Sequence, residues 1–352
     1  MPTVAQLNSI EGSSSQRSRR PVFVTGCHRS GTNLLYDILL AAGGFAVYRG
    51  YIPIYKTLIP HFGPLENIHN RKRIIDTWIL SKGFLRSGLV AQQLTEKLLS
   101  GAGTGGDFLR IIMGEISQKQ GVDRWAVYDP DNLLRIPRIK ADIPDALFIH
   151  IIRDGRDIAL SLKKMGGFTP FPWSRHTRSL LETALYWEWM VRKGRAYGRA
   201  IPSDYIEIHY ENLVKDPAST LAQLSKFLDH DLDYERVRHG GLERKSNSSF
   251  LDEMKPGAES PVNRWRHRLS PTEVISLESH VGSCLVEFGY DLTVPEVQRQ
   301  PHWWQAGTAA AYRSFLDTKL WLKQHTPLSR LANLSELELP ESASGAEEQP
   351  SI

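Results

Sequence analysis

The chain has 352 residues, of which 41% are hydrophobic and 23% charged, and its formal net charge is +4. This composition is typical of a globular protein with a substantial core, in one large α/β domain or two average ones. A charge so close to neutral argues against a nucleic-acid binder, which needs a dense basic stripe, but it suits an anionic ligand. Two cysteines, Cys27 and Cys284, are too few for a disulfide framework or a zinc site, and we expect reduced thiols.

The ends of the chain differ in composition from the middle. Residues 1–20 are polar and lack the apolar stretch of a secretory signal, and no apolar run is long enough for a transmembrane segment. We therefore expect a cytoplasmic protein with a disordered tail over residues 1–20. The acidic stretch 336–352 is expected to be a second disordered tail.

Residues 22–40, VFVTGCHRSGTNLLYDILL, combine a strand, a glycine-bounded loop and the start of a helix. Residues 22–25 are β-branched or aromatic, which predicts a buried strand. Gly26 ends that strand, Gly31 allows a sharp turn, and the apolar residues after Thr32 have helical spacing. The free backbone N–H groups at such a helix start point to one place, which predicts an anion site.

The loop has the glycine spacing of a P-loop without its lysine. In GxxxxGK(S/T) a lysine would follow Gly31, but here Thr32 follows directly and Arg29 is the cation inside the loop. The missing lysine argues against a nucleoside triphosphatase and against a small-molecule kinase. A phosphate cradle that contains an arginine and needs no metal is the interpretation that remains.

Further along the chain, strands alternate with helices. Prolines 53, 60 and 64 rule out a long helix there, and helical patterns return in what we interpret as an insertion over about 60–122. Strands are predicted at 125–129, 146–152 and 205–209, and helices at 71–82, 90–100, 107–120, 133–142, 154–164, 183–199, 218–228 and 271–288. The alternation predicts an α/β fold with a P-loop-like central parallel sheet flanked by helices, in one domain over 21–292. A helix at 308–323 is expected in a C-terminal helical extension over 293–335.

The strand at 146–152 ends in Arg153, and Ser161 lies on the helix that follows. Because ligands bind at the C-terminal ends of parallel strands, the sheet is expected to bring Arg153 close to Arg29. An arginine fork makes bidentate contacts and suits a terminal phosphate. A surface ladder of salt bridges within RDGRD is the alternative interpretation.

These two stretches resemble PAPS-dependent sulfotransferases, most of all bacterial ones and more remotely tyrosylprotein sulfotransferases. In that family the first loop binds the 5′-phosphosulfate, and an arginine in V/I-R-D-x-R-D with a serine eight residues later binds the 3′-phosphate; Arg153 and Ser161 match. PVNRWRHRLS resembles the family's C-terminal basic segment, which closes over the nucleotide. The resemblance covers about 21–292. It implies that PAPS is bound by Gly26, Cys27, His28, Arg29, Ser30, Gly31, Thr32, Asn33, Arg153, Ser161, Ser248, Arg264 and Arg268.

The resemblance implies transfer of the sulfuryl group from PAPS to a hydroxyl or amine, with release of PAP. Arg29 would neutralise charge on the leaving oxygen. HYENLVKDP resembles a further family segment, in which Glu211 would have a structural, helix-capping role. The acceptor can be a small molecule, a glycan, a lipid or a peptide, and a homodimer is possible.

The part of the site that would bind the acceptor departs from the family pattern. The glutamate that commonly acts as general base is missing from VYRGYIP, and Tyr128 stands where many relatives have a lysine or another polar residue. His28 is therefore our candidate for the acid–base residue, while His61, Glu66 and His69 lie nearby in sequence but in no motif. The alternatives are a non-catalytic PAPS- or PAP-binding protein and a P-loop-type small-molecule kinase, which would need the absent lysine. The aromatic residues Tyr48, Tyr51, Tyr55, Phe62, Trp187 and Trp189 line an apolar acceptor pocket or belong to the core.

Overall fold

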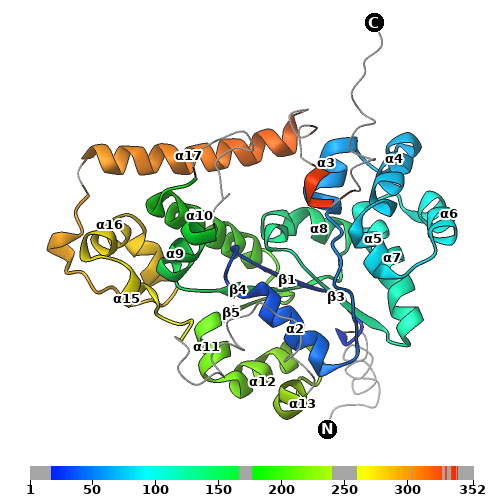
Figure 1. Ribbon diagram of the computed structural model, residues 1–352, viewed down its shortest axis with the longest axis horizontal. Helices are drawn as coiled ribbons and strands as arrows, with labels where there is room; N and C mark the ends of the chain where they lie inside the picture. Colours follow the sequence, from blue (N-terminus) through cyan, green and yellow to red (C-terminus); the bar gives the residue numbers. More distant parts are fainter. Residues whose placement is uncertain are drawn as a thin grey trace, which may run out of the picture.

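Five parallel strands form the centre of the computed structural model (Figure 1). The structure describes residues 17–165, 177–239, 260–301, 303–326, 330, 334–337 and 339. The strand order is β2-β3-β1-β4-β5, with β1 in the middle. The strands are β1 (Val22–Gly26), β2 (Phe45–Ala46), β3 (Arg124–Tyr128), β4 (Leu147–Ile152) and β5 (Tyr205–His209). All four strand pairings are parallel, which confirms the predicted α/β sheet.

The sheet is covered on both faces, because successive side chains of each strand point to opposite sides. On β1, Val22 and Val24 join a core with α2 (Thr32–Ala42), α11 (Tyr210–Lys215), α12 (Pro217–Leu228) and α13 (Tyr234–His239). Phe23 belongs to the other core, which includes α8 (Ile136–Asp142), α9 (Gly155–Met165) and α10 (Leu180–Arg199). Figure 1 shows these two groups of helices below and above the sheet. The central strands are consequently buried along their whole length.

The predicted helical insertion lies beside the sheet, on the side of β3 (Figure 1). Its helices are α3 (Ile59–Phe62), α4 (Ile68–Ile79), α5 (Lys82–Ser87), α6 (Ala91–Gly101) and α7 (Gly105–Gln120). A single turn of π-helix, η1 (Ile54–Leu58), leads into α3. The prolines keep both elements short, as the sequence indicated, because Pro53 precedes η1 and Pro60 occupies the first turn of α3.

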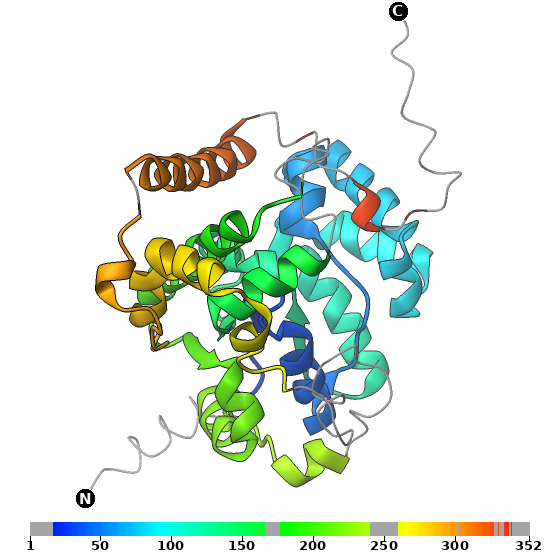
Figure 2. The same ribbon diagram turned by 60° about the vertical axis from the view of Figure 1, so that its left-hand side comes forward.

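The C-terminal part returns to the face that α10 covers. It comprises α15 (Trp265–Arg268), α16 (Pro271–Glu287), η4 (Glu296–Gln298), α17 (Trp303–His325) and η6 (Leu334–Leu337). Figure 2 shows α17 on the outer side of α10 and α16, away from the sheet. Polar contacts attach it: the Trp189 indole donates a hydrogen bond to Asp317 at 2.9 Å, and Arg313 pairs with Glu188 at 2.7 Å. These contacts place α17 against the α/β domain.

Several predicted boundaries were wrong by a few residues. The helix expected at 183–199 begins at Leu180, because Ser179 and Glu182 form a capping box. The helix expected at 133–142 is divided into a 3₁₀ segment, η2 (Pro130–Arg135), and α8, which has a proline in its first turn. The helix expected at 308–323 starts at Trp303, and the two-residue strand β2 was not predicted.

Most of the two predicted tails lies outside the described residues. Arg17 and Arg20, which we assigned to the first tail, nevertheless contact the domain: Arg17 donates to the Phe227 carbonyl at 2.6 Å and Arg20 to Asp204 at 3.0 Å. In the part of the chain that the structure describes, no helix combines the length and the apolar character needed to cross a bilayer.

Candidate functional site

The loop between β1 and α2 is held in a strained, closed conformation. Arg29 and Gly31 both have positive φ angles, 72° and 103°, and for the arginine this costs free energy. The Ser30 hydroxyl donates to the Cys27 carbonyl at 2.7 Å, and a side chain at Gly26 would meet the Ile151 carbonyl at 2.5 Å. Gly31 precedes α2 without a side-chain cap among the described residues, so its first N–H groups remain available to an anion.

Cys27 of this loop is fully buried, and burial raises the pKa of its thiol. A thiol in that state is a poor nucleophile, so the cysteine contributes its backbone to the cradle rather than its sulfur.

The second stretch meets this loop through Arg153 and Ser161. The Arg29 side chain donates to the Ser161 hydroxyl at 3.0 Å, and Arg153 donates to the Arg29 carbonyl at 3.3 Å. Arg153 is held from other sides as well, since it donates to the Pro261 carbonyl and its guanidinium lies over the Tyr210 ring at 4.4 Å. The expected approach of Arg29 and Arg153 at one sheet edge is confirmed.

The basic segment is anchored above Arg153 by buried charges of α9. Asp157 accepts the backbone N–H groups of Asn263 and Trp265, both at 2.9 Å. The Arg156 guanidinium stacks on the Trp265 ring at 3.8 Å and pairs with Glu278 at 2.6 Å. The RDGRD stretch is therefore neither a surface ladder nor a set of exposed charges.

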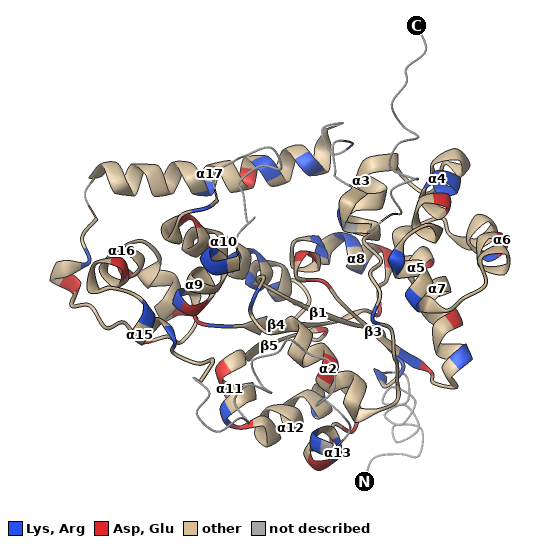
Figure 3. Cartoon of the chain, viewed as in Figure 1, with Lys and Arg blue, Asp and Glu red and all other residues tan. Residues whose placement is uncertain are grey.

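Two predicted members of this segment lie further out. Arg264 donates through its side chain to the Ser260 carbonyl at 3.1 Å, and Arg268 is exposed at the end of α15. Ser248, the third predicted residue from this part of the chain, lies outside the described residues. Figure 3 shows that Lys and Arg positions are interspersed with Asp and Glu positions along the chain and do not gather in one stripe.

Glu211 has a structural role at a neighbouring helix. It accepts the backbone N–H of Asp154 at 2.9 Å, immediately before α9, and the Tyr290 hydroxyl at 3.1 Å. Burial raises the pKa of this carboxyl. Glu211 thus fixes the backbone that carries Arg153.

A charged cluster lies on the other side of the loop, where β3 ends. Asp131 is 3.4 Å from the His28 imidazole and 2.7 Å from the Lys56 ammonium. Burial alone would raise the pKa of Asp131, but Lys56 and His28 outweigh it and hold this pKa well below the usual range. Burial likewise acts to lower the pKa of His28, but the charge of Asp131 raises it overall. The pair favours an ionised carboxylate beside a protonated imidazole.

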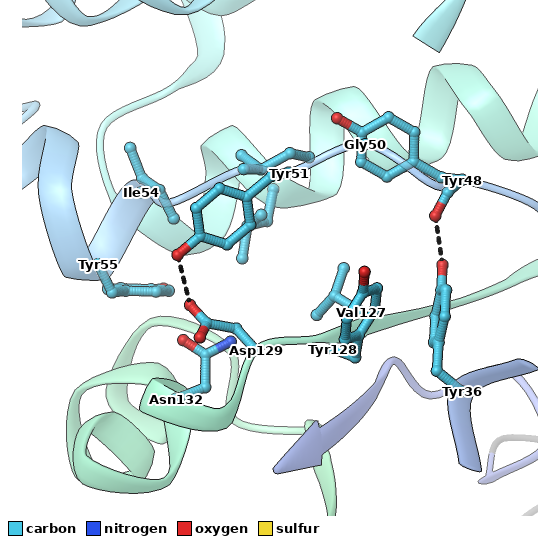
Figure 4. A pocket seen from close by; sticks show the side chains of 12 residues that line it. Tyr36, Tyr48, Gly50, Tyr51, Ile54, Tyr55, Val127, Tyr128, Asp129 and Asn132 are labelled. Carbon is cyan, nitrogen blue, oxygen red and sulfur yellow. Dashed lines mark hydrogen bonds between the residues drawn. The ribbon is translucent and has the colours of Figure 1, made fainter. Parts of the chain in front are cut away.

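A small tyrosine-lined cavity lies next to this cluster (Figure 4). Its volume of about 20 Å³ has room for about one water molecule. Asp129 faces it and accepts the Tyr51 hydroxyl at 3.1 Å and the backbone N–H of Asp131 at 2.9 Å. The other lining residues include Tyr36, Tyr48, Tyr55 and Tyr128.

Residues 21–234, more than half of the chain, match the model of the sulfotransferase family. The chain belongs to this family. A putative protein-tyrosine sulfotransferase of Caenorhabditis elegans is 27% identical over 118 residues, covering 32% of this chain and 43% of that protein. Its counterpart in Caenorhabditis briggsae is 25% identical over 142 residues, covering 39% and 48%. The chain thus spans less than half the length of these curated relatives.

Among solved structures, the sulfotransferase domain from the curacin biosynthetic pathway is similar to this chain, with a TM-score of 0.52 and 16% identity. The match covers 77% of this chain and 98% of that domain. At this level of identity the likeness shows that the fold is shared.

The features in which this chain departs from the expected family pattern lie at the tyrosine-lined cavity. Tyr48 occupies the region of the usual glutamate, and its hydroxyl donates to the Gly83 carbonyl at 3.0 Å. Lys56, on η1, adds a cation beside Asp131. It belongs to no sequence motif and was not predicted. Asp129 and Asp131 were also missed, although they directly follow a strand, like Arg153.

The remaining acid–base candidates and tryptophans lie elsewhere. His61 is edge-on to Phe62, while Glu66 and His69 are exposed at the start of α4. Trp187 is buried and donates to the Arg153 carbonyl at 3.0 Å, and Trp189 contacts α17. The structure therefore assigns both tryptophans to packing. Of the aromatic residues considered, Tyr48, Tyr51 and Tyr55 line the cavity.

Proposed function

We propose that this protein transfers the sulfuryl group of PAPS to a hydroxyl or amine of an acceptor and releases PAP. Membership of the sulfotransferase family supports this function. The observation that carries it is the contact between Arg153 and the Arg29 carbonyl at 3.3 Å, at the ends of the adjacent strands β1 and β4. One cradle for the 5′-phosphosulfate and one arginine for the 3′-phosphate then lie side by side.

The chemistry of the transfer requires neutralisation of charge on the oxygen that leaves with PAP. Arg29 is suited to this role because Ser161 holds its guanidinium beside the loop at 3.0 Å. The backbone N–H groups at Thr32 and Asn33 and the Thr32 hydroxyl would bind the 5′-phosphate. Gly26, Ser30 and Gly31 shape this backbone.

His28 is better suited to carry positive charge than to accept a proton. Asp131 lies 3.4 Å from its ring and favours the protonated imidazole, whose pKa is raised. We therefore assign His28 to the donor side, where it adds to the charge of Arg29. Lys56 balances Asp131 from the opposite side.

Arg264 and Arg268 belong to the segment that would close over the nucleotide. The anchoring of this segment by Asp157 supports such a position for Arg264. Ser248 is proposed on the family resemblance alone.

The acceptor we favour is a phenolic hydroxyl such as that of a peptide tyrosine. Both curated relatives carry the name of protein-tyrosine sulfotransferases, and the cavity beside the loop is lined by aromatic rings. Small-molecule, glycan and lipid acceptors are the alternatives. We also propose a cytoplasmic location, which the two free, buried cysteines support. A homodimer stays a prediction.

Titration calorimetry with PAP, and in parallel with ATP, both without Mg²⁺, tests the donor site. We expect tight binding of PAP and weak binding of ATP. Arg153→Ala should weaken PAP binding by about 10- to 100-fold, because a charge-assisted contact to phosphate contributes about 1.5–3 kcal/mol.

The matched control is Arg192→Ala, which removes an arginine that pairs with Glu188 and Glu287 away from the loop. This variant should bind PAP like the unchanged protein. A preference for ATP, or an equal effect of both substitutions, would contradict the proposed donor site. PAP binding without sulfuryl transfer to any acceptor would favour the non-catalytic alternative.

A further inference from the structure

We propose that Asp129 is the general base of this site and that the acceptor hydroxyl enters the tyrosine-lined cavity that Asp129 faces. This inference rests on the proposed sulfuryl transfer. It assigns the role of the missing family glutamate to a carboxylate directly after β3.

The sheet order places Asp129 on the opposite side of the loop from Arg153. β1 lies between β3 and β4, and Val24 of β1 is in register with Tyr128 of β3. The next residue, Asp129, donates its backbone N–H to the Val24 carbonyl at 3.3 Å. A donor bound with its 3′-phosphate toward β4 therefore has its reactive end toward the β3 side, where Asp129 lies.

The carboxylate of Asp129 retains room for a further hydrogen bond. Its two oxygens each accept one bond, from the Tyr51 hydroxyl at 3.1 Å and the Asp131 N–H at 2.9 Å. A carboxylate has about four lone-pair positions, so an acceptor hydroxyl can donate to it as well. The water-sized cavity next to it matches the volume of one hydroxyl group.

Charged groups from three elements surround Asp129. Asp131 and Arg135 come from η2, Lys56 from η1 and His28 from the loop. Burial raises the pKa of Asp129 and the charge of Asp131 raises it further, while Lys56 and Arg135 oppose them. The result is a carboxylate more basic than an ordinary aspartate, next to one that stays ionised.

The reaction then balances without a further reactant. The acceptor oxygen forms a bond to sulfur while its O–H bond breaks and the proton passes to Asp129. The bond between sulfur and the bridging oxygen breaks, and its electron pair leaves with PAP, beside Arg29. Asp129 later releases the proton to water.

Asp129 also caps η2, since it accepts the Asp131 N–H, and this structural role must be separated from catalysis. Asp129→Asn makes the separation, because asparagine caps a helix about as well as aspartate but is not a base. The control is Asp142→Asn, which alters a carboxylate that accepts the Tyr55 hydroxyl at 3.0 Å. Asp142 is not among the residues that line the cavity.

The experiment uses the full chain, radiolabelled PAPS and two probe acceptors at pH 7.5. Phenol keeps its proton at this pH, whereas 4-nitrophenol is largely ionised and needs no base. Asp129→Asn should lower turnover of phenol by at least about 100-fold and that of 4-nitrophenol by less than about 10-fold. Binding of PAP should not change, and Asp142→Asn should turn over both acceptors like the unchanged protein. An equal loss with both phenols, or no loss, overturns the inference.

A second variant covers the case in which Asp129→Asn does not fold. Tyr51→Phe removes a hydrogen bond to the ionised carboxylate, so the pKa of Asp129 should rise further. The rate falls as pH drops through this pKa, and in the variant that fall should begin at a higher pH. If neither phenol is used, the pH profile of PAPS hydrolysis gives the same comparison. If the pH profile of Tyr51→Phe equals that of the protein without the substitution, the inference is overturned. If the protein without any substitution neither binds PAP nor consumes PAPS, the proposed function is refuted instead.

Discussion

Arg29 shows how a single residue combines backbone strain with chemistry. Its φ of 72° lies in a region that arginine rarely adopts, and such strain is typical of ligand-binding sites. The strained backbone directs the Arg29 carbonyl to Arg153 and the side chain to Ser161. One residue thereby links the two halves of the proposed donor site.

Replacement of Arg29 should abolish most of the catalysis while leaving the fold intact. For Arg29→Ala we expect turnover to fall by about 100- to 1,000-fold, the loss typical of a group that stabilises developing negative charge. Arg29→Lys keeps the positive charge but loses the guanidinium hydrogen bond to Ser161. Its turnover should therefore lie between that of the unchanged protein and that of Arg29→Ala.

The measurement for Arg29 is steady-state sulfuryl transfer from radiolabelled PAPS, with circular dichroism as the control for folding. Ser161→Ala, which frees the guanidinium without removing it, should reduce turnover by about 10-fold or less. Normal turnover in Arg29→Ala would refute the proposed role.

At the scale of elements, the proposed donor site is a repeated arrangement of strand, turn and helix. β1 leads into the loop and α2, and β4 leads through Arg153 into α9. Packing of α11 against the first unit leaves little room, since a side chain at Gly31 would meet the Tyr210 ring at 2.5 Å. Tyr210 is the ring under Arg153, so the shape of the loop and the position of Arg153 are coupled.

Two glycines that flank α2 allow this coupling to be tested. Gly31 and Gly43 precede and follow the helix with φ angles of 103° and 81°, but a side chain at Gly43 would have nothing within 4 Å. Gly43→Ala should therefore cost only the backbone strain, about 1–3 kcal/mol. Gly31→Ala adds a clash with Tyr210 and should cost more and displace the loop.

Urea unfolding gives the stability of both variants, and calorimetry gives their affinity for PAP. We expect Gly43→Ala to bind PAP normally and Gly31→Ala to bind it at least about 10-fold more weakly. Equal PAP affinities in the two variants would show that the loop tolerates the displacement of Tyr210.

At the scale of the whole molecule, a buried polar network joins the sheet to α10. His150 on β4 is fully buried and lies 2.6 Å from the Tyr205 hydroxyl, which in turn donates to Glu207 at 3.0 Å. Arg195 of α10 pairs with Glu207 at 2.5 Å. Burial lowers the pKa of His150 to about 4, so the folded protein holds this imidazole neutral.

The network predicts a loss of stability in mild acid. Below a pH of about 6.5 the unfolded chain protonates His150 while the folded protein does not, so unfolding takes up a proton and becomes easier. Stability should fall by about 3 kcal/mol as pH drops from about 6.5 to about 4 through this residue alone.

Urea unfolding at several pH values tests this, with His150→Phe as the control. The variant keeps a buried ring but cannot be protonated, and its stability should depend less on pH between 6.5 and 4. If the free energy of unfolding depends on pH in the same way in both proteins, His150 does not control the loss of stability in acid.

The donor half of the site was predictable because its residues lie in local patterns. Gly26, Arg29 and Gly31 form one short motif, and Arg153 follows a continuous apolar strand. The rule that parallel strands end at the same edge of a sheet then predicts that the two motifs meet. The absence of the P-loop lysine after Gly31 could likewise be read from this short motif alone.

The acceptor half was not predictable in this way. Asp129 and Asp131 follow β3, but only the packing of η1 against η2 shows that Lys56 and Tyr51 face them. A tyrosine suits a packed core as well as a cavity wall. The sequence pattern therefore left both interpretations open for Tyr51 and Tyr55. The tertiary structure places them around the cavity and assigns Trp187 and Trp189 to packing.

The sequence by itself determined the α/β sheet, the glycine-bounded loop and the arginine beside it, because strand periodicity, glycine positions and strand ends are local properties. Only the tertiary structure decided which charges surround the loop and which carboxylate faces the cavity. Those contacts depend on how η1 and the residues before it pack against η2 and the loop. They shift the pKa values of His28, Asp129 and Asp131 through burial and neighbouring charge.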